Sequence, residues 1–148
     1  MIATNARADG TLLGFDFGTH RIGVAVGNRR LGSARTLTTL ACQHGPDWAA
    51  IEQLIRDWQP EALVVGVPLT MSGEPQAATR GAYAFIQNLV ARFKLPVHGA
   101  DERMSSMEAQ SQLRMQRASG QRRRRVRDAD VDSTAAKLIL EHWLRDNP

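Results

Sequence analysis

Apolar and polar residues in the first part of the chain follow the period-two pattern of β-strands. Three strands are predicted, over residues 12–17, 22–28 and 34–40. The links between them are short, which favours an antiparallel meander, because parallel neighbours need a long crossover. The first strand is apolar except for Asp16. An ionised carboxylate there costs several kcal/mol unless a hydrogen-bond donor, a basic side chain or a metal ion pairs with it.

Helical and strand patterns alternate in the middle of the chain. Apolar residues at helical spacing predict a helix between Pro46 and Pro60. An unbroken apolar run over 62–67 is typical of a strand covered on both faces, as in a parallel sheet. A long apolar stripe predicts a second helix that begins near Pro75, and a fifth strand is predicted over 96–100.

The last third of the chain is predicted to hold two helices around a charged loop. Residues 105–108 read Ser-Ser-Met-Glu, a capping box, so a helix is predicted from there to about Arg117. Residues 120–129 contain few apolar side chains and several like charges, which predicts a mobile loop. A final helix is predicted from near Asp132 to near Arg145. The expected order is therefore β-β-β-α-β-α-β-α-α, with no internal repeat.

Length and composition favour a small intracellular globular protein. The chain has 148 residues, which suggests one domain over 12–148 after a flexible polar tail over 1–11. No apolar run approaches the ~20 residues of a membrane span, and the polar start lacks a signal-peptide core. Cys42 is the one cysteine, so no internal disulfide is expected and the cytoplasm is the default compartment.

Positive charge is concentrated near the C-terminal third. A stretch of fourteen residues without an acid contains Arg114, Arg117, Arg122, Arg123, Arg124, Arg125 and Arg127. Such a segment favours a polyanionic partner such as nucleic acid. The alternative interpretation is a solvated loop.

Three acids occupy unusual positions: Asp16 in the first strand, Glu102 just after the fifth, and Asp132 at the start of the last helix. Each has a simpler explanation when it is taken alone. Asp16 could be hydrogen-bonded in a hairpin turn, and Asp132 could be a helix N-cap. The offsets of the apolar residues after Asp132 nevertheless place it on the inward-facing side of its helix.

If the first, fourth and fifth strands are parallel neighbours, Asp16 and Glu102 lie toward one edge of the sheet, where the final helix could bring Asp132. Like charges about 4 Å apart repel by roughly 4 kcal/mol at an effective dielectric near 20. Such a cluster therefore needs protons or a cation. Carboxylate oxygens favour Mg²⁺ or Mn²⁺, and a pair of such ions can activate water for phosphodiester cleavage.

At this point the sequence resembles the YqgF/RuvX family of pre-16S rRNA nucleases and Holliday junction resolvases, which have an RNase H-like fold. Four motifs in order carry the resemblance, which spans about residues 13–144. They are Gly14-Phe15-Asp16-Phe17-Gly18-Thr19 with Arg21-Ile22-Gly23-Val24-Ala25; Val65-Gly66-Val67-Pro68-Leu69 with Gly73; Asp101-Glu102-Arg103 with Ser105; and Val131-Asp132-Ser133 with Ala135-Ala136.

The resemblance implies an α/β fold with a five-stranded mixed sheet, strand order 3-2-1-4-5, and helices on both faces. It also implies that Asp16, Glu102 and Asp132 form a metal-binding, catalytic acidic cluster for Mg²⁺ or Mn²⁺. Family members often carry a lysine shortly before the last aspartate. Here Asp128 and Asp130 take the place of those lysines, and the positive charge lies upstream.

The leading hypothesis is a two-metal-ion endonuclease that acts on structured RNA or branched DNA, as a monomer or a homodimer. Processing of the 5′ end of pre-16S rRNA, in ribosomal precursor particles, is preferred over Holliday junction resolution. The predicted nucleic-acid contacts are Thr19, Arg21, Arg80, Arg103, Arg122, Arg123, Arg124, Arg125 and Arg127; Arg80 and Arg103 could equally be surface charges.

Two other functions stay open on the sequence. Asp-Phe-Gly-Thr followed by Gly-Val-Ala-Val resembles the first phosphate-binding hairpin of sugar-kinase- and actin-like ATPases. Those enzymes clamp ATP between two domains of this fold, and only one is predicted here. The chain could also be a non-catalytic nucleic-acid-binding protein that keeps the fold.

Overall fold

The computed structural model describes residues 10–18, 20–68, 77–101 and 128–147, and the side chains of the last range from residue 132 onward. Its strands are β1 (Thr11–Phe17), β2 (Arg21–Asn28), β3 (Ser33–Ala41), β4 (Ala62–Val67) and β5 (Val97–Asp101), and its helices are α1 (Trp48–Trp58), α2 (Ala77–Phe93) and α4 (Asp128–Asp146). The helix predicted over 105–117 lies outside the described residues, as does the predicted start of α2 at Pro75.

The five strands form one mixed sheet in the order β3-β2-β1-β4-β5, as the family resemblance implied. β2 pairs antiparallel with both β1 and β3, which confirms the meander. β4 pairs parallel with both β1 and β5. The carboxyl ends of β1, β4 and β5 therefore meet at one edge of the sheet, which we call the carboxyl edge.

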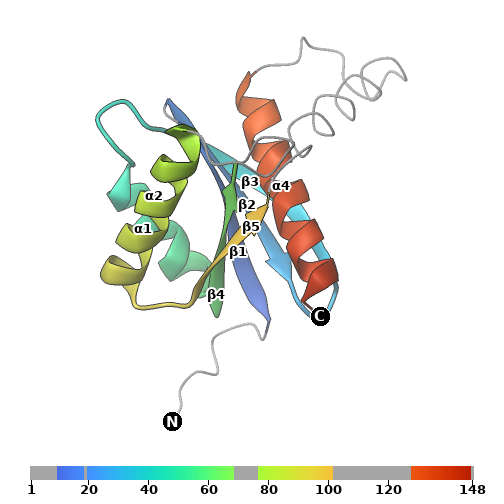
Figure 1. The fold of residues 1–148 in the computed structure, drawn as a ribbon. Coiled ribbons are helices and arrows are strands. Elements are labelled where there is room, and N and C mark those ends of the chain that lie inside the picture. The colour runs from blue at the N-terminus through green and yellow to red at the C-terminus, as the bar shows by residue number, and fades with distance from the viewer. Residues whose placement is uncertain (1–9, 19, 69–76, 102–127, 148) are drawn as a thin grey trace.

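Helices cover both faces of the sheet, as predicted. Figure 1 shows α1 and α2 on one face and α4 on the other. Leu13, Phe15 and Val65 belong to the cluster on the α1 and α2 face. Leu12 and Val64 belong to the cluster beneath α4. Side chains alternate across a strand, so successive residues of β1 serve different layers.

Helix α1 has a side-chain cap at its start and a left-handed residue at its end. The Asp47 side chain accepts a hydrogen bond from the Ala50 N–H at 3.1 Å, so Asp47 caps the helix that was predicted to begin at Pro46. Gln59 adopts the left-handed conformation after the helix, and its N–H donates to the Ile55 carbonyl at 2.8 Å. Pro60 cannot continue the ladder, because it has no N–H.

The predicted apolar stripe of α2 is only partly buried. Ala82, Phe85 and Leu89 are buried, whereas Val90 is 45% exposed and Ala78 is also exposed. The stripe is therefore narrower than predicted.

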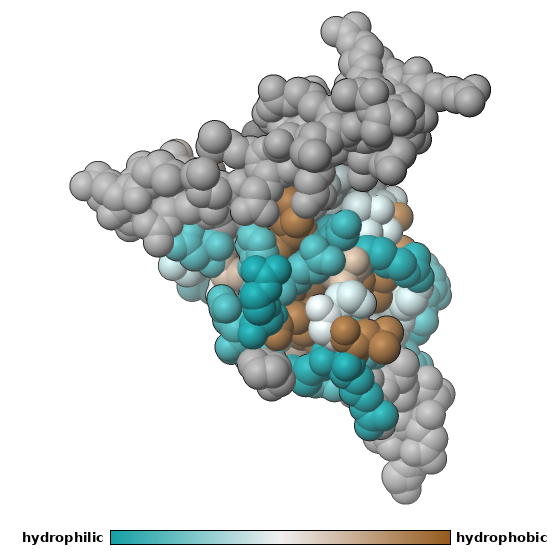
Figure 2. Space-filling view, turned by 90° about the vertical axis from the view of Figure 1, so that its right-hand side faces the viewer, coloured by the Kyte–Doolittle hydropathy of each residue, from teal (hydrophilic) through white to brown (hydrophobic). Residues whose placement is uncertain are grey.

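Figure 2 shows the side of the molecule that carries α4, where hydrophilic residues surround small apolar areas.

Helix α4 begins at Asp128, which corrects two predictions. Residues 128 and 129, predicted to belong to a mobile loop, are helical. Asp132 lies inside the helix, so the alternative interpretation of Asp132 as an N-cap is wrong. Acidic residues are favourable in the first turn of a helix, because the helix dipole is positive there. The prediction began the helix near Asp132 because it did not treat Asp128 and Asp130 as residues that favour the first turn of a helix.

No helix within the described ranges is both long and apolar enough to traverse a lipid bilayer.

Candidate metal and nucleic-acid site

The carboxyl edge of the sheet brings three strand ends into one row. Phe15 of β1 is in register with Val65 of β4, and Val65 is in register with Gly99 of β5. Two residues further along, Val67 pairs with Asp101, the last residue of β5. Neighbouring strands are about 4.8 Å apart, so groups at the ends of β1 and β5 lie roughly 10 Å apart at the backbone.

Asp16 lies one residue before the end of β1, on the face that α4 covers. Leu12 and Gly14, at the same alternation, face this helix: Leu12 belongs to the cluster beneath α4, and a Cβ on Gly14 would come within 3.0 Å of the Leu140 Cβ. Asp16 is half-buried and pairs with Gly23 of β2. Directly opposite residues of antiparallel strands share a face. The Asp16 carboxylate therefore starts on the α4 side of the sheet.

Gly23 is the point where α4 contacts the sheet backbone. A Cβ at Gly23 would lie 2.1 Å from the carbonyl oxygen of Asp132 and 2.4 Å from its carbonyl carbon. No side chain fits this space, so glycine allows the helix to lie directly on β2. As the cross-strand partner of Asp16, Gly23 brings Asp132 next to the strand pair that carries Asp16.

Arg21, at the start of β2, forms an ion pair with Asp132. The Nε of Arg21 donates to the Oδ2 of Asp132 at 2.7 Å. The two side chains are 42% and 24% exposed. A pair this accessible to solvent contributes about 1 kcal/mol or less to stability. The pair therefore adds little to the free energy of folding, and its consequence is a positive charge directly beside the Asp132 carboxylate.

The third predicted acid, Glu102, lies outside the described residues. Among the residues that are described, no group of three His, Cys, Asp or Glu side chains is placed to hold a metal ion. The structure thus brings Asp16 and Asp132 to neighbouring positions and leaves the full trio as a prediction. Oxygen donors of this kind suit Mg²⁺ or Mn²⁺ rather than a softer metal.

Most of the predicted nucleic-acid contacts also lie outside the described ranges, namely Thr19, Arg103, Arg122, Arg123, Arg124, Arg125 and Arg127. Arg80 is exposed in the first turn of α2. The neighbouring Thr79 is buried, and its hydroxyl donates to the carbonyl of Pro68, the residue after β4. This contact places the start of α2 at the carboxyl edge, so the phosphate contact predicted for Arg80 fits its position and stays a prediction.

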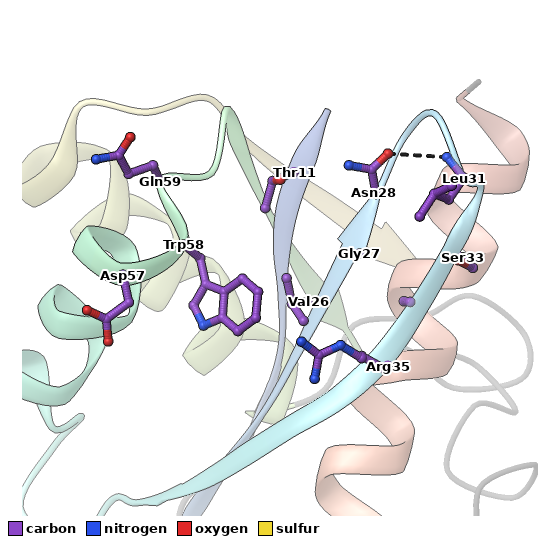
Figure 3. Close-up of a pocket in the computed structure, with 11 residues that line it drawn as sticks. Thr11, Val26, Gly27, Asn28, Leu31, Ser33, Arg35, Asp57, Trp58 and Gln59 are labelled. Atoms are coloured by element: carbon purple, nitrogen blue, oxygen red, sulfur yellow. Dashed lines mark hydrogen bonds between the residues drawn. The ribbon is translucent and has the colours of Figure 1, made fainter. Parts of the chain in front are cut away.

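A separate cavity lies at the other end of the sheet. It has a volume of about 450 Å³, and its lining includes Thr11, Asn28, Arg35 and Trp58. Figure 3 shows the Trp58 ring between α1 and the strands, with the Arg35 side chain reaching toward it. The Arg35 guanidinium lies 5.1 Å from the Trp58 ring centroid. These residues come from the start of β1, the end of β2, the first part of β3 and the end of α1, so the cavity is not part of the acidic site.

Sequence reasoning missed two functional features of this site. Arg21 was predicted only as a phosphate contact, and its pairing with Asp132 was not foreseen. Gly23 was quoted as part of a motif without a reason. The available signal was the occurrence of Gly23 opposite Asp16 in a predicted hairpin, which marks a close backbone approach.

The family model described as RuvX, Holliday junction resolvase, matches residues 10–146, which is nearly the whole chain.

The chain belongs to the RuvX family.

Curated relatives agree with RuvX membership. A protein of Pseudomonas putida is 50% identical over 137 residues, covering 92% of this chain and 95% of the relative. A protein of Azotobacter vinelandii is 48% identical over 139 residues, covering 93% and 94%. Both are named "Putative pre-16S rRNA nuclease".

Solved structures share the fold of this RuvX chain. RuvC of Thermus thermophilus, in complex with a Holliday junction substrate, aligns with a TM-score of 0.56 and 18% identity, over 92% of this chain and 94% of that one. The yeast mitochondrial Holliday junction resolvase Ydc2 aligns with a TM-score of 0.52 and 12% identity, over 94% and 79%. At these identities the likeness shows the fold, which confirms the predicted RNase H-like architecture.

Proposed function

We propose that this chain is a divalent-metal-dependent nuclease that hydrolyses phosphodiester bonds in structured nucleic acid. One observation carries the proposal: Asp16 and Asp132 come from opposite ends of the chain, yet Gly23 pairs with the first and contacts the backbone of the second. Two carboxylates on one face of a sheet edge repel each other unless a cation or a proton compensates. The family description and the names of the relatives point to the same chemistry.

Asp16, Asp132 and Glu102 would hold the metal. His98 stacks on Trp143 of α4, and Ala100 packs in the cluster beneath α4, so alternate residues of β5 face the same helix as Asp16. Glu102 follows Ala100 by two residues in the sequence, which supports the proposal that it belongs to the cluster. When bound, Mg²⁺ or Mn²⁺ would activate water and neutralise charge on the reacting phosphate, singly or as a pair.

The protein itself would supply position and charge. β1, β2 and α4 hold the two described carboxylates on packed backbone, which limits their movement relative to each other. The arginine-rich segment, with Arg80 and Arg103, would bind phosphates on either side of the cleaved bond. Contacts of this kind carry little sequence information, so we expect recognition of nucleic-acid structure more than of base sequence.

The 5′ end of pre-16S rRNA is the substrate we prefer. The support is the name shared by the Pseudomonas and Azotobacter relatives, which are 50% and 48% identical to this chain over nearly its full length. This proposal places the protein with ribosomal precursor particles in the cytoplasm.

Resolution of Holliday junctions is the second candidate, because the matching family model carries that description. Resolution normally requires two symmetry-related cuts, hence a homodimer with two acidic sites. Trimming of an RNA end requires one. The oligomeric state that accompanies activity therefore discriminates between the two functions.

The test is a cleavage assay with the purified chain, Mg²⁺ or Mn²⁺, and separately a pre-16S rRNA 5′ fragment and a four-way DNA junction. We expect metal-dependent cutting of the RNA and no turnover of ATP. Asp16→Asn should abolish cutting while the protein stays folded. The control Asp57→Asn, on the exposed surface of α1, should leave it unchanged. Full activity of Asp16→Asn would contradict the mechanism, and binding without cutting by the natural chain would favour a non-catalytic role.

A further inference from the structure

The ion pair between Arg21 and Asp132 affects the affinity of the proposed metal site for a divalent ion. Asp132 Oδ2 accepts a hydrogen bond from Arg21 Nε at 2.7 Å. The main chain beneath this pair is tightly packed, because Gly23 leaves no room for a Cβ below the Asp132 carbonyl. The aspartate backbone is thus held in place. The arginine side chain, 42% exposed, borders solvent.

Two effects of Arg21 on a divalent ion at Asp132 oppose each other. The hydrogen bond orients the carboxylate, which favours metal binding. The guanidinium charge neutralises the carboxylate and repels the ion, which disfavours it. Repulsion of a doubly charged ion is twice that of a single charge at the same distance, and both cations contact one small group. The packing at Gly23 fixes the Asp132 backbone whether or not Arg21 is present, and the full guanidinium charge lies 2.7 Å from the carboxylate oxygen. We therefore take repulsion to be the larger effect.

We propose that Arg21 is an internal competitor for the metal at Asp132, and that metal loading displaces its guanidinium from the carboxylate. This inference rests on the proposed function, because it takes Asp132 as a metal ligand. It also gives Arg21 a defined task before any phosphate contact. The displaced guanidinium stays anchored at the start of β2, beside the acidic cluster, where its charge can meet a substrate phosphate.

The experiment measures Mn²⁺ binding by the full chain, without nucleic acid, by titration calorimetry. Arg21→Gln should lower the dissociation constant for Mn²⁺ by about fivefold to twentyfold, because the competing charge is gone. Arg21→Lys keeps the charge and should stay within about twofold of the natural chain. Arg56→Gln is the matched control, since Arg56 forms a similar ion pair with Glu52 at 2.6 Å on the exposed surface of α1. It should change nothing.

The salt dependence of Mn²⁺ affinity distinguishes repulsion by Arg21 from a purely structural role of Arg21. Repulsion between the guanidinium and the ion is screened at high ionic strength. The affinity gain of Arg21→Gln should therefore shrink markedly between 0.05 M and 1 M salt. Thermal unfolding of each variant shows whether the fold is intact.

The outcomes separate this inference from the proposed function. No Mn²⁺ binding by the natural chain, or binding that survives Asp132→Asn unchanged, would overturn the metal site itself. If Asp132→Asn loses Mn²⁺ but Arg21→Gln binds with equal or lower affinity, the metal site stands. Arg21 is then a positioning residue rather than a competitor, and the inference is overturned.

Discussion

At the scale of single residues, the site depends on a position that has no side chain. Gly23 lets α4 lie on β2, with 2.1 Å between an added Cβ and the Asp132 carbonyl oxygen. The clash is with main-chain atoms, so a rotamer change cannot relieve it. Gly23 therefore couples the packing of a whole helix to the place of one carboxylate.

Replacing Gly23 with alanine should force α4 away from β2. We expect a loss of about 1–3 kcal/mol in the free energy of unfolding, measured by urea denaturation, and a larger proportional loss of metal-dependent cleavage. Gly81→Ala is the control, because its Cβ would meet only the Phe17 ring at 3.1 Å and alanine favours the helix. An unchanged stability of Gly23→Ala would show that α4 does not rest on this glycine.

Cys42 provides a second residue-scale prediction. Cys42 is 4% exposed, and burial raises the pKa of its thiol above the ordinary value. The thiol should react slowly with a maleimide at neutral pH in the folded protein and rapidly in urea. The raised pKa means that folding favours the protonated thiol. The free energy of unfolding should therefore fall as pH rises above about 8.5, and Cys42→Ser should remove that part of the fall. Rapid labelling of the folded chain would contradict the burial.

At the scale of elements, Arg29 ties the end of α4 to the sheet. Its guanidinium contacts Glu61 at 3.2 Å and the Asn147 carbonyl at 3.4 Å, and it lies 5.5 Å from the Trp143 ring centroid. Glu61 also accepts from the Gly10 N–H at 2.9 Å. One arginine after β2 thus links the first strand, the loop before β4 and the last helix.

Arg29→Met should loosen the C-terminal end of α4. Methionine keeps most of the apolar part of the arginine side chain but removes its charged contacts. We therefore expect the free energy of unfolding to fall by about 1 kcal/mol. Part of the loss is offset, because the buried Nε of Arg29 has no hydrogen-bond partner among the described residues. Hydrogen exchange should accelerate in the last turn of α4. Arg30→Met, at the exposed neighbouring position, should leave that exchange unchanged.

At the scale of the whole molecule, charge and topology act together. Parallel pairing of β1, β4 and β5 brings the ends of these strands, with Asp16 near the end of β1, to the carboxyl edge. The arginine-rich segment stands in the sequence between β5, which ends at this edge, and α4, and we expect its charge to act near the acidic site. A polyanion attracted by that charge would be delivered to the acids.

Replacing Arg123 and Arg124 with alanine should flatten the plot of log affinity against log salt. If both contact phosphates, the slope should change by about 1.4–1.8 units, measured by filter binding to RNA or duplex DNA at several salt concentrations. The control is the double variant Arg30→Ala and Arg145→Ala, which removes the same two positive charges from another part of the surface. An identical slope in both double variants would exclude the segment as a specific binding element.

The sequence by itself determined most of the strands and helices and the side chains that could act chemically. Residues 62–67 were predicted as a strand because an unbroken apolar run of this length suits a strand that is covered on both faces, and β4 has those bounds. Asp16 was singled out because a carboxylate in an apolar strand needs a partner. The start of α4 was missed because the acids near residue 128 look like loop residues when the helix dipole is ignored.

Only the tertiary structure decided which groups meet. The pairing of Arg21 with Asp132 and the contact of Gly23 with the Asp132 backbone join residues far apart in the chain. No local pattern encodes such contacts, because they depend on how a helix settles onto a completed sheet. The acids were visible in the sequence, whereas the pairing of Arg21 with one of them follows from tertiary packing.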